Sequence, residues 1–167
     1  MLVKGSLVVI ISDTSPISNL MHIELIHLLQ DLYSEVIIPV AVYEELSVIP
    51  QQKSIIDQQN WISIRSVENQ ERIEELLLHL DRGESEAIVL AQELKADLLL
   101  IDELKGRSIA NQKSMRTIGL LGVLIEAKEN NLVNQVKPLL DQLIDDFQFR
   151  VHPNLYNRVL LIVDEQK

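Results

Sequence analysis

The chain contains no cysteine, few aromatic residues and no long hydrophobic run. The absence of cysteine excludes disulfide bonds, thiolate metal sites and cysteine-based nucleophilic catalysis. The longest apolar runs, such as residues 7–11 and 98–101, are far too short to span a bilayer. Residues 1–6 carry one lysine, but no long apolar segment follows it. The sequence therefore predicts a cytoplasmic protein without a signal peptide or a membrane-spanning helix.

Positive charge is also scarce. Lys and Arg number 15 against 25 Asp and Glu, which gives a formal net charge of −10. Tight, passive binding of nucleic acid normally needs a basic surface, so this charge argues against such binding. It does not argue against an enzyme that meets phosphates through bound divalent cations, because the cations invert the local sign of the charge.

Aliphatic side chains dominate the apolar content. Hydrophobic residues make up 47% of the chain although aromatic residues make up only 4%, which is typical of a buried parallel sheet covered by helices. Short runs without alternation predict buried strands at residues 7–12, 35–39, 97–101 and 116–118, and the alternating residues 61–65 predict an edge strand. Because helical patterns separate these runs, the sequence predicts an α/β fold with right-handed crossovers and a parallel sheet.

The helical patterns divide the chain further. A helix is expected over residues 40–47, then a polar connection over 50–53 and a short helix over 54–59. Helices over residues 68–80 and 84–94 are expected to be separated by Asp81-Arg82-Gly83, and three more helices to occupy residues 120–130, 136–147 and 155–163. The length of 167 residues fits one domain over residues 1–167. Its core is expected at about 7–130, with a helical C-terminal extension at about 131–167.

Acidic residues recur where strands end or helices begin. Asp13 follows the first predicted strand and Asp102 ends the strand at 97–101. If both strands are parallel, both carboxylates lie at the carboxyl edge of the sheet, where ligands bind in open α/β folds. Glu45 lies on a helix that begins at this edge, and Glu84 and Glu86 lie in the first turn of a later helix. Such oxygen-only donors suit Mg²⁺ or Mn²⁺, and their mutual repulsion favours a bound cation.

Each of these acids also has an ordinary structural explanation. Asp13 and Asp102 could be helix N-caps. Glu84 and Glu86 fit the general preference for acids in a first helical turn, and Glu45 could lie on a solvated helix face. A phospho-receiver module would also gather acids and Mg²⁺ at this edge, but it needs a pair of acids after the first strand. Only the coincidence of the acids at one edge favours a functional site.

Five segments of the chain resemble PIN domains, in the order in which that family has them. They are SDTSPISNL (residues 12–20), IIPVAVYEEL (37–46), DRGESEAIVLA (81–91), LLLIDELKGR (98–107) and TIGLLGVLIEAK (117–128). The resemblance is to a bacterial and archaeal branch of predicted nucleic-acid-binding proteins. It implies a PIN-like three-layer α/β/α sandwich with a central parallel sheet, often assembled as a homodimer. It also implies a Mg²⁺- or Mn²⁺-dependent endoribonuclease that hydrolyses RNA, in many relatives the toxin of a toxin–antitoxin pair.

The resemblance further implies roles for single acids. Asp13, Glu45 and Asp102 match metal-binding, catalytic positions of the family. For the fourth acid two matches stay open, since Glu86 matches the toxin-type pattern and Glu84 matches the Gly-Glu pair of this branch. Glutamate stands where the toxins usually have aspartate, which leaves an alternative: a PIN-like module that binds RNA or protein with little or no cleavage.

Three residues are candidates for substrate contacts. Ser15 matches a family position that often touches the metal shell or the phosphate. Lys105 and Arg107 come just after Asp102 and could contact the RNA backbone, with a solvated helix face as the alternative. The partners that follow from the resemblance are an RNA substrate, a cognate antitoxin protein and a second copy of the chain.

Overall fold

The structure is a computed structural model that describes residues 8–166. It contains one five-stranded sheet, all parallel, in the order β3-β2-β1-β4-β5. The strands are β1 (Ile10–Ser12), β2 (Val36–Pro39), β3 (Ile62–Arg65), β4 (Leu98–Leu100) and β5 (Thr117–Ile118). The helices are α1 (Thr14–His22), α2 (His27–Tyr33), α3 (Val40–Ser47), α4 (Pro50–Asp57), α5 (Gln70–Leu77), α6 (Arg82–Glu93), α7 (Leu104–Gln112), α8 (Leu120–Glu129), α9 (Lys137–Phe147) and α10 (Pro153–Ile162). The predicted α/β fold with a parallel sheet is confirmed.

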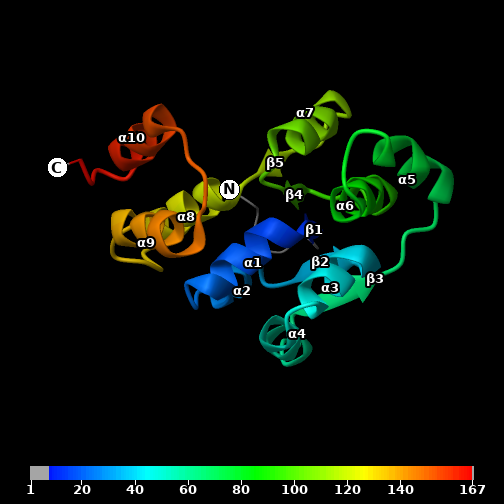
Figure 1. Ribbon diagram of the computed structural model, residues 1–167, viewed down its shortest axis with the longest axis horizontal. Coiled ribbons are helices and arrows are strands. Elements are labelled where there is room, and N and C mark those ends of the chain that lie inside the picture. The colour runs from blue at the N-terminus through cyan, green and yellow to red at the C-terminus, as the bar shows by residue number, and fades with distance from the viewer. Residues whose placement is uncertain (1–7, 167) are drawn as a thin grey trace.

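Helices cover both faces of the sheet. Ile10 of β1 packs into a core shared with α1, α2, α8 and α9, whereas its neighbour Ile11 packs into a second core shared with α5, α6 and α7. Figure 1 shows these two groups of helices on opposite sides of the strands. Successive residues of a strand point to opposite faces, so a strand with helices on both sides needs apolar side chains throughout. The result is the three-layer α/β/α sandwich that the sequence predicts.

The strand order places a switch point between β1 and β4. The chain adds β2 and then β3 on one side of β1, and afterwards adds β4 and β5 on the other side. At the carboxyl end of these two central strands, the Asp13 backbone N–H donates to the Leu100 carbonyl over 2.9 Å. In open α/β sheets, ligands bind in the crevice at such a switch point. A ligand site is therefore expected at the residues that follow β1 and β4.

The predicted edges of several elements are wrong or fall outside the described residues. The sequence predicts that the first strand begins at residue 7, which lies outside the described residues, whereas β1 begins at Ile10. The connection expected over residues 50–53 is helical, because Pro50 occupies the first turn of α4, where a missing N–H and a fixed φ suit a helix. The break expected over Asp81-Arg82-Gly83 is wrong for two of its three residues. Asp81 is the N-cap of α6, and Arg82 and Gly83 are the first two residues of the helix.

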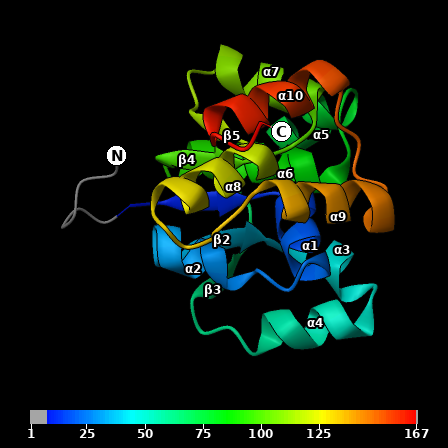
Figure 2. The ribbon, with the colours of Figure 1, turned by 90° about the vertical axis from the view of Figure 1, so that its left-hand side faces the viewer.

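The helical C-terminal segment packs on the chain's own core. Leu140 of α9 and Val159 of α10 belong to the same buried cluster as Ile10. Figure 2 shows α8, α9 and α10 in front of the sheet. Glu165, beyond α10, accepts the backbone N–H groups at the start of α9 and pairs with Lys128 over 3.2 Å. Among the described residues, 8–166, no helix has the length and apolarity needed to cross a membrane.

Candidate functional site

Asp13 and Asp102 lie at the carboxyl edge on neighbouring strands. Asp13 directly follows β1 and is only 4% exposed, and Asp102 stands two residues beyond β4. Asp13 occupies the N-cap position of α1, yet its side chain makes no capping hydrogen bond. The cap explanation therefore does not account for this buried carboxyl group.

Asp102 does serve as a cap, but for a distant helix. Its Oδ1 accepts the backbone N–H of Leu120, at the start of α8, over 2.7 Å. The other oxygen, Oδ2, is buried and has no hydrogen-bond partner within the described part of the chain. Arg107 of α7 lies close by, because a Cβ built on Gly119 would be 2.9 Å from Asp102 Oδ1 and 3.4 Å from Arg107 Nη1. Asp102 thus lies just beyond the end of β4, contacts the start of α8 and lies near Arg107 of α7.

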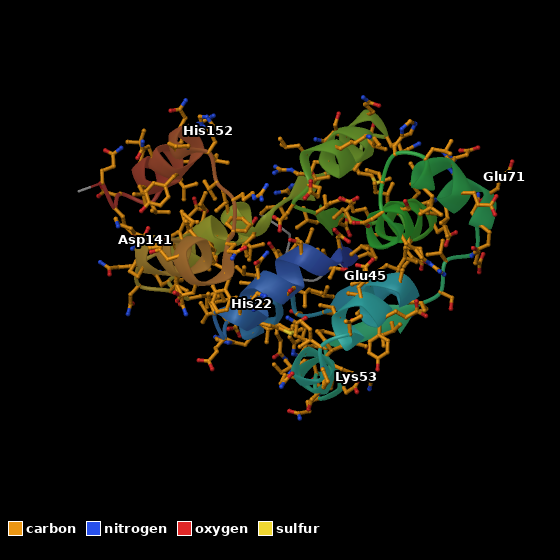
Figure 3. The ribbon with its side chains drawn as sticks, viewed as in Figure 1. His22, Glu45, Lys53, Glu71, Asp141 and His152 are labelled. Carbon is orange, nitrogen blue, oxygen red and sulfur yellow. The ribbon has the colours of Figure 1, made fainter. Side chains whose placement is uncertain are left out.

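Glu45 reaches the same edge from α3. Its carboxylate accepts the side-chain hydroxyl of Thr14 in α1 and, over 3.1 Å, the backbone N–H of Gly83 in α6. Figure 3 labels Glu45 between these helices. A solvated helix face is therefore the wrong explanation for Glu45, which is half-buried.

Glu84 and Glu86 lie two residues apart in α6 and face different partners. Glu84 forms a capping box with Asp81: the Glu84 N–H donates to Asp81 Oδ1 over 2.8 Å, and Glu84 Oε2 accepts the Asp81 N–H over 3.2 Å. The remaining oxygen, Glu84 Oε1, is buried without a partner, 3.5 Å from where a Cβ on Gly106 would stand. Glu86 instead accepts the Ala41 N–H at the start of α3 over 3.2 Å and pairs with Arg82 over 3.0 Å.

The carboxyl groups perturb one another. Burial raises the pKa of Asp13 well above its usual range, and the negative charges of Asp81, Glu84 and Glu45 add to this rise, while the Thr14 N–H opposes it. Burial likewise raises the pKa of Glu84, again with contributions from Asp81 and Glu45. A like charge in the vicinity disfavours ionisation and so raises the pKa of an acid. We refer to Asp13, Glu45, Asp81 and Glu84, which are linked by these effects, as the acidic cluster.

The pKa of Asp102 is affected by a different set of groups. Burial raises its pKa above the usual range, although the Leu120 N–H, the Ser15 hydroxyl and the Arg107 charge all act in the opposite direction. A buried carboxylate is costly unless a positive charge or hydrogen-bond donors compensate it. The protein groups present compensate Asp102 only in part.

The donor set fits a hydrated divalent cation. Glu84 Oε1 and Asp102 Oδ2 are buried acceptors without partners in the described chain, and a cation would satisfy such oxygens. Within residues 8–166, no three acidic or histidine side chains approach closely enough to hold one ion by themselves. Mg²⁺ does not require three, because it often keeps several waters and takes only one or two carboxylates together with substrate phosphates.

A family model described as a PIN domain (DUF3368) matches residues 9–165. The chain belongs to the PIN-domain family. The match confirms the resemblance and extends it through the helical C-terminal segment. PIN domains are commonly nucleases that use divalent metal ions and act on nucleic acids, so the fold is nuclease-like. No curated protein and no solved structure matches the chain.

Two of the three candidate substrate-binding residues of this PIN domain, Ser15 and Arg107, act on Asp102. Ser15 is half-buried in the first turn of α1, where Asn19 Nδ2 donates to its hydroxyl oxygen over 3.2 Å. Arg107 is half-buried on α7, and Lys105 is exposed in the first turn of the same helix. Both basic side chains thus start from the helix that follows the acid at β4.

Two residues of the site escaped the sequence analysis. Asp81 belongs to the acidic cluster, and its spacing to Glu84 is that of a capping box, a signal that could have placed both at the start of α6. Thr14 is not among the residues that the sequence singles out for the site, yet its hydroxyl donates to Glu45, 31 residues away in the chain. No pattern in the neighbouring sequence predicts this contact between Thr14 and Glu45.

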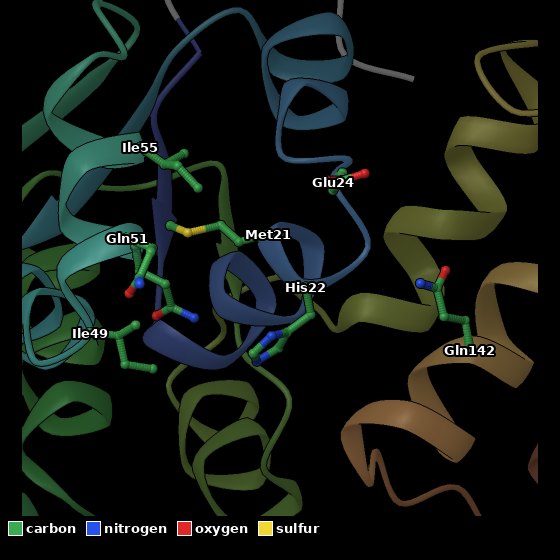
Figure 4. Close-up of a pocket in the computed structure, with 8 residues that line it drawn as sticks. Met21, His22, Glu24, Ile49, Gln51, Ile55 and Gln142 are labelled. Carbon is green, nitrogen blue, oxygen red and sulfur yellow. The ribbon is translucent and has the colours of Figure 1, made fainter.

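The PIN domain also has a pocket of about 520 Å³ outside the acidic cluster. Met21 and His22, at the far end of α1, form one wall, and Ile49 and Ile55 of the α4 segment form another. Gln142 of α9 faces them (Figure 4). None of the candidate acids lines this pocket.

Proposed function

We propose that this PIN domain is a metal-dependent endoribonuclease that hydrolyses RNA phosphodiester bonds. One observation supports this above all: acidic side chains from separate segments lie at the switch-point edge of a parallel sheet, and Glu84 Oε1 and Asp102 Oδ2 are buried there without a hydrogen-bond partner among residues 8–166. RNA as the substrate comes from the resemblance of the chain to ribonuclease members of the family.

We assign Mg²⁺ or Mn²⁺ to Asp13, Glu45, Glu84 and Asp102. Glu84 is preferred to Glu86 because both oxygens of Glu86 already have protein partners, the Ala41 N–H and Arg82. Glu84 uses one oxygen in its capping box and keeps the other free. When bound, the divalent ion activates water and neutralises charge that develops on the phosphate.

The protein residues have separate tasks in this proposal. Asp13 is buried among other carboxylates, so it concentrates negative charge where a cation must bind. Arg107 lies beside Asp102 and supplies a positive charge next to the acids, in place to hold the phosphate. Lys105, exposed on the same helix, extends this basic side toward solvent. These two residues offset locally the net charge of −10 that opposes the approach of RNA.

The test is cleavage of mixed RNA by the purified protein with Mn²⁺, with EDTA, and with Mn²⁺ restored. Cleavage that EDTA stops and Mn²⁺ restores supports the proposal, and single-stranded DNA as a second substrate tests the choice of RNA. Glu44→Gln is the matched control for Glu45→Gln, because Glu44 is the adjacent, exposed glutamate. RNA binding without cleavage at any Mn²⁺ concentration would instead identify a binding module, the alternative that the helix glutamates leave open.

The toxin role, the antitoxin and the homodimer depend on the resemblance alone, and we propose them on that basis. A small open reading frame beside the gene, whose product co-purifies with this chain, would support the toxin role. Light scattering of the isolated chain measures its oligomeric state directly. A monomer at working concentration contradicts the homodimer.

A further inference from the structure

The Glu45 carboxylate lies directly against the first turn of α6. Gly83 is the second residue of that helix, and its N–H is one of the backbone donors that a helix start leaves without an intrahelical partner. Glu45 Oε1 accepts this N–H over 3.1 Å, and Glu45 Oε2 accepts the Thr14 hydroxyl. Each carboxylate oxygen therefore has one donor, and the two donors come from different helices.

Only a residue without a side chain leaves room for this contact. A Cβ on Gly83 would stand 2.6 Å from Glu45 Oε2, 2.7 Å from Oε1 and 2.9 Å from Cδ. Something must therefore shift when a side chain is added, and because all three atoms belong to the far end of the Glu45 side chain, the carboxylate is the group that moves. Gly83 is helical without a positive φ, so conformational freedom does not explain the glycine. Alanine would normally be better in a helix by about 1 kcal/mol.

We propose that Gly83 and Thr14 are positioning residues that hold the Glu45 carboxylate at the metal site. This inference rests on the proposed function. Thr14 directly follows Asp13 in the chain and Gly83 directly precedes Glu84, so the two donors hold the Glu45 carboxylate next to the residues that carry the other two acids. A carboxylate has about four lone-pair directions, so the two donors leave each oxygen able to bind a cation or a metal-bound water.

The first experiment measures Mn²⁺ binding by isothermal titration calorimetry. We expect Gly83→Ala and Thr14→Val each to weaken Mn²⁺ binding by about tenfold or more, the usual effect of losing a group that orients a metal ligand. Thr14→Ser keeps the hydroxyl and is expected to bind as the wild type does. Equal affinity in the wild type and in Gly83→Ala would overturn the positioning role and leave the proposed function standing.

The second experiment uses the metal-free protein in EDTA and follows thermal unfolding. Gly83→Ala is expected to lower the unfolding midpoint, because the new methyl group meets the Glu45 carboxylate. In a Glu45→Ala background the same change is expected to raise the midpoint, because the space is then free and alanine favours the helix. In a Glu44→Ala background the midpoint should still fall. The absence of this reversal of sign would overturn the inference.

The two experiments separate the two proposals. A wild-type protein that binds no Mn²⁺ overturns the metal centre and, with it, the role of Gly83 and Thr14 in positioning a ligand. A wild type that binds Mn²⁺, together with a Gly83→Ala variant that does not reverse its effect when Glu45 is removed, overturns the positioning role alone.

Discussion

Leu120 donates its backbone N–H to Asp102 over 2.7 Å, so the acid that follows β4 is held by the first turn of α8. This arrangement recurs in the chain: Glu45 accepts an N–H at the start of α6, Glu86 at the start of α3, and Glu165 at the start of α9. A negative charge at a helix N-terminus is favourable. These four acids therefore have a structural use, and α3, α8 and α9, which lack a local side-chain cap, receive one from a distant segment.

Replacing Asp13 by Asn should separate activity from stability. The change keeps the shape and removes one negative charge from among Asp81, Glu84 and Glu45. RNA cleavage should fall by roughly a hundredfold or more, in the range for losing a key electrostatic group of an active site. The metal-free protein should become more stable, with an unfolding midpoint higher by about 2–4 °C for each ~1 kcal/mol of relieved repulsion. Asp31→Asn, an exposed change on α2, is the control, and full activity of Asp13→Asn would remove Asp13 from the site.

The metal-free protein should lose stability as the pH rises. The pKa values of Asp13, Glu84 and Asp102 are raised in the folded protein, mainly by burial, whereas in the unfolded chain these groups ionise near pH ~4. Between that pH and the raised folded values, the folded state binds more protons than the unfolded state. Its free energy of unfolding therefore falls as the pH rises through this window.

Urea unfolding in EDTA at pH ~5 and pH ~8 measures this effect. The protein should be more stable at the lower pH, and saturating Mn²⁺ should restore stability at the higher pH, because the cation favours the ionised carboxylates. Asp13→Asn should show a smaller change with pH than the wild type. The same pH dependence in both proteins would show that Asp13 does not contribute to it.

Glu84→Gln and Glu86→Gln should have different consequences. Glu84 carries the free buried oxygen, so its replacement should weaken Mn²⁺ binding by about tenfold or more. Glu86 pairs with Arg82 and accepts the Ala41 N–H, so its replacement should lower stability by about 1–2 kcal/mol and leave Mn²⁺ affinity near that of the wild type. Calorimetry and urea unfolding of both variants check this. The opposite pattern would make Glu86 the ligand.

The sequence predicts the layers and the sheet edge because both follow from local patterns. Runs such as that of β4 are apolar on both faces, and a strand with this pattern must lie under two layers of helices. Parallel strands then place Asp13 and Asp102 at one edge without any knowledge of contacts. The family resemblance adds Glu45, whose position on α3 does not by itself distinguish a site residue from a solvated one.

The choice between Glu84 and Glu86 depends on contacts that the sequence does not contain. Both acids fit the first turn of α6, but Glu86 accepts the Ala41 N–H at the start of α3, whereas Glu84 Oε1 has no partner among the described residues. The use of Gly83 is equally hidden, because a glycine between Arg82 and Glu84 suggests a break in the helix when read locally. It makes room for a carboxylate from α3, 38 residues away in the chain. The roles of these residues therefore depend on contacts between segments that are distant in the sequence.

Glu165→Gln should weaken the attachment of the C-terminal segment without changing the site. Glu165 accepts the Val136 and Lys137 N–H groups over 2.8 and 2.7 Å and pairs with Lys128. Hydrogen bonds to a charged group contribute about 1.5–3 kcal/mol, so a loss of stability of about that size is expected. Glu129→Gln, an exposed change at the end of α8, is the control.

Glycine at position 119 should prove as restrictive as glycine at position 83. A Cβ on Gly119 would stand 2.9 Å from Asp102 Oδ1 and 3.4 Å from Arg107 Nη1. Gly119→Ala should therefore displace Asp102 from the Leu120 N–H and move Arg107 with it. Stability should fall by about 1 kcal/mol or more, since alanine is also a poor N-cap for α8, and Mn²⁺ binding should weaken together with RNA binding. If Asp102 is not a ligand, calorimetry will show a destabilised variant whose Mn²⁺ affinity is unchanged.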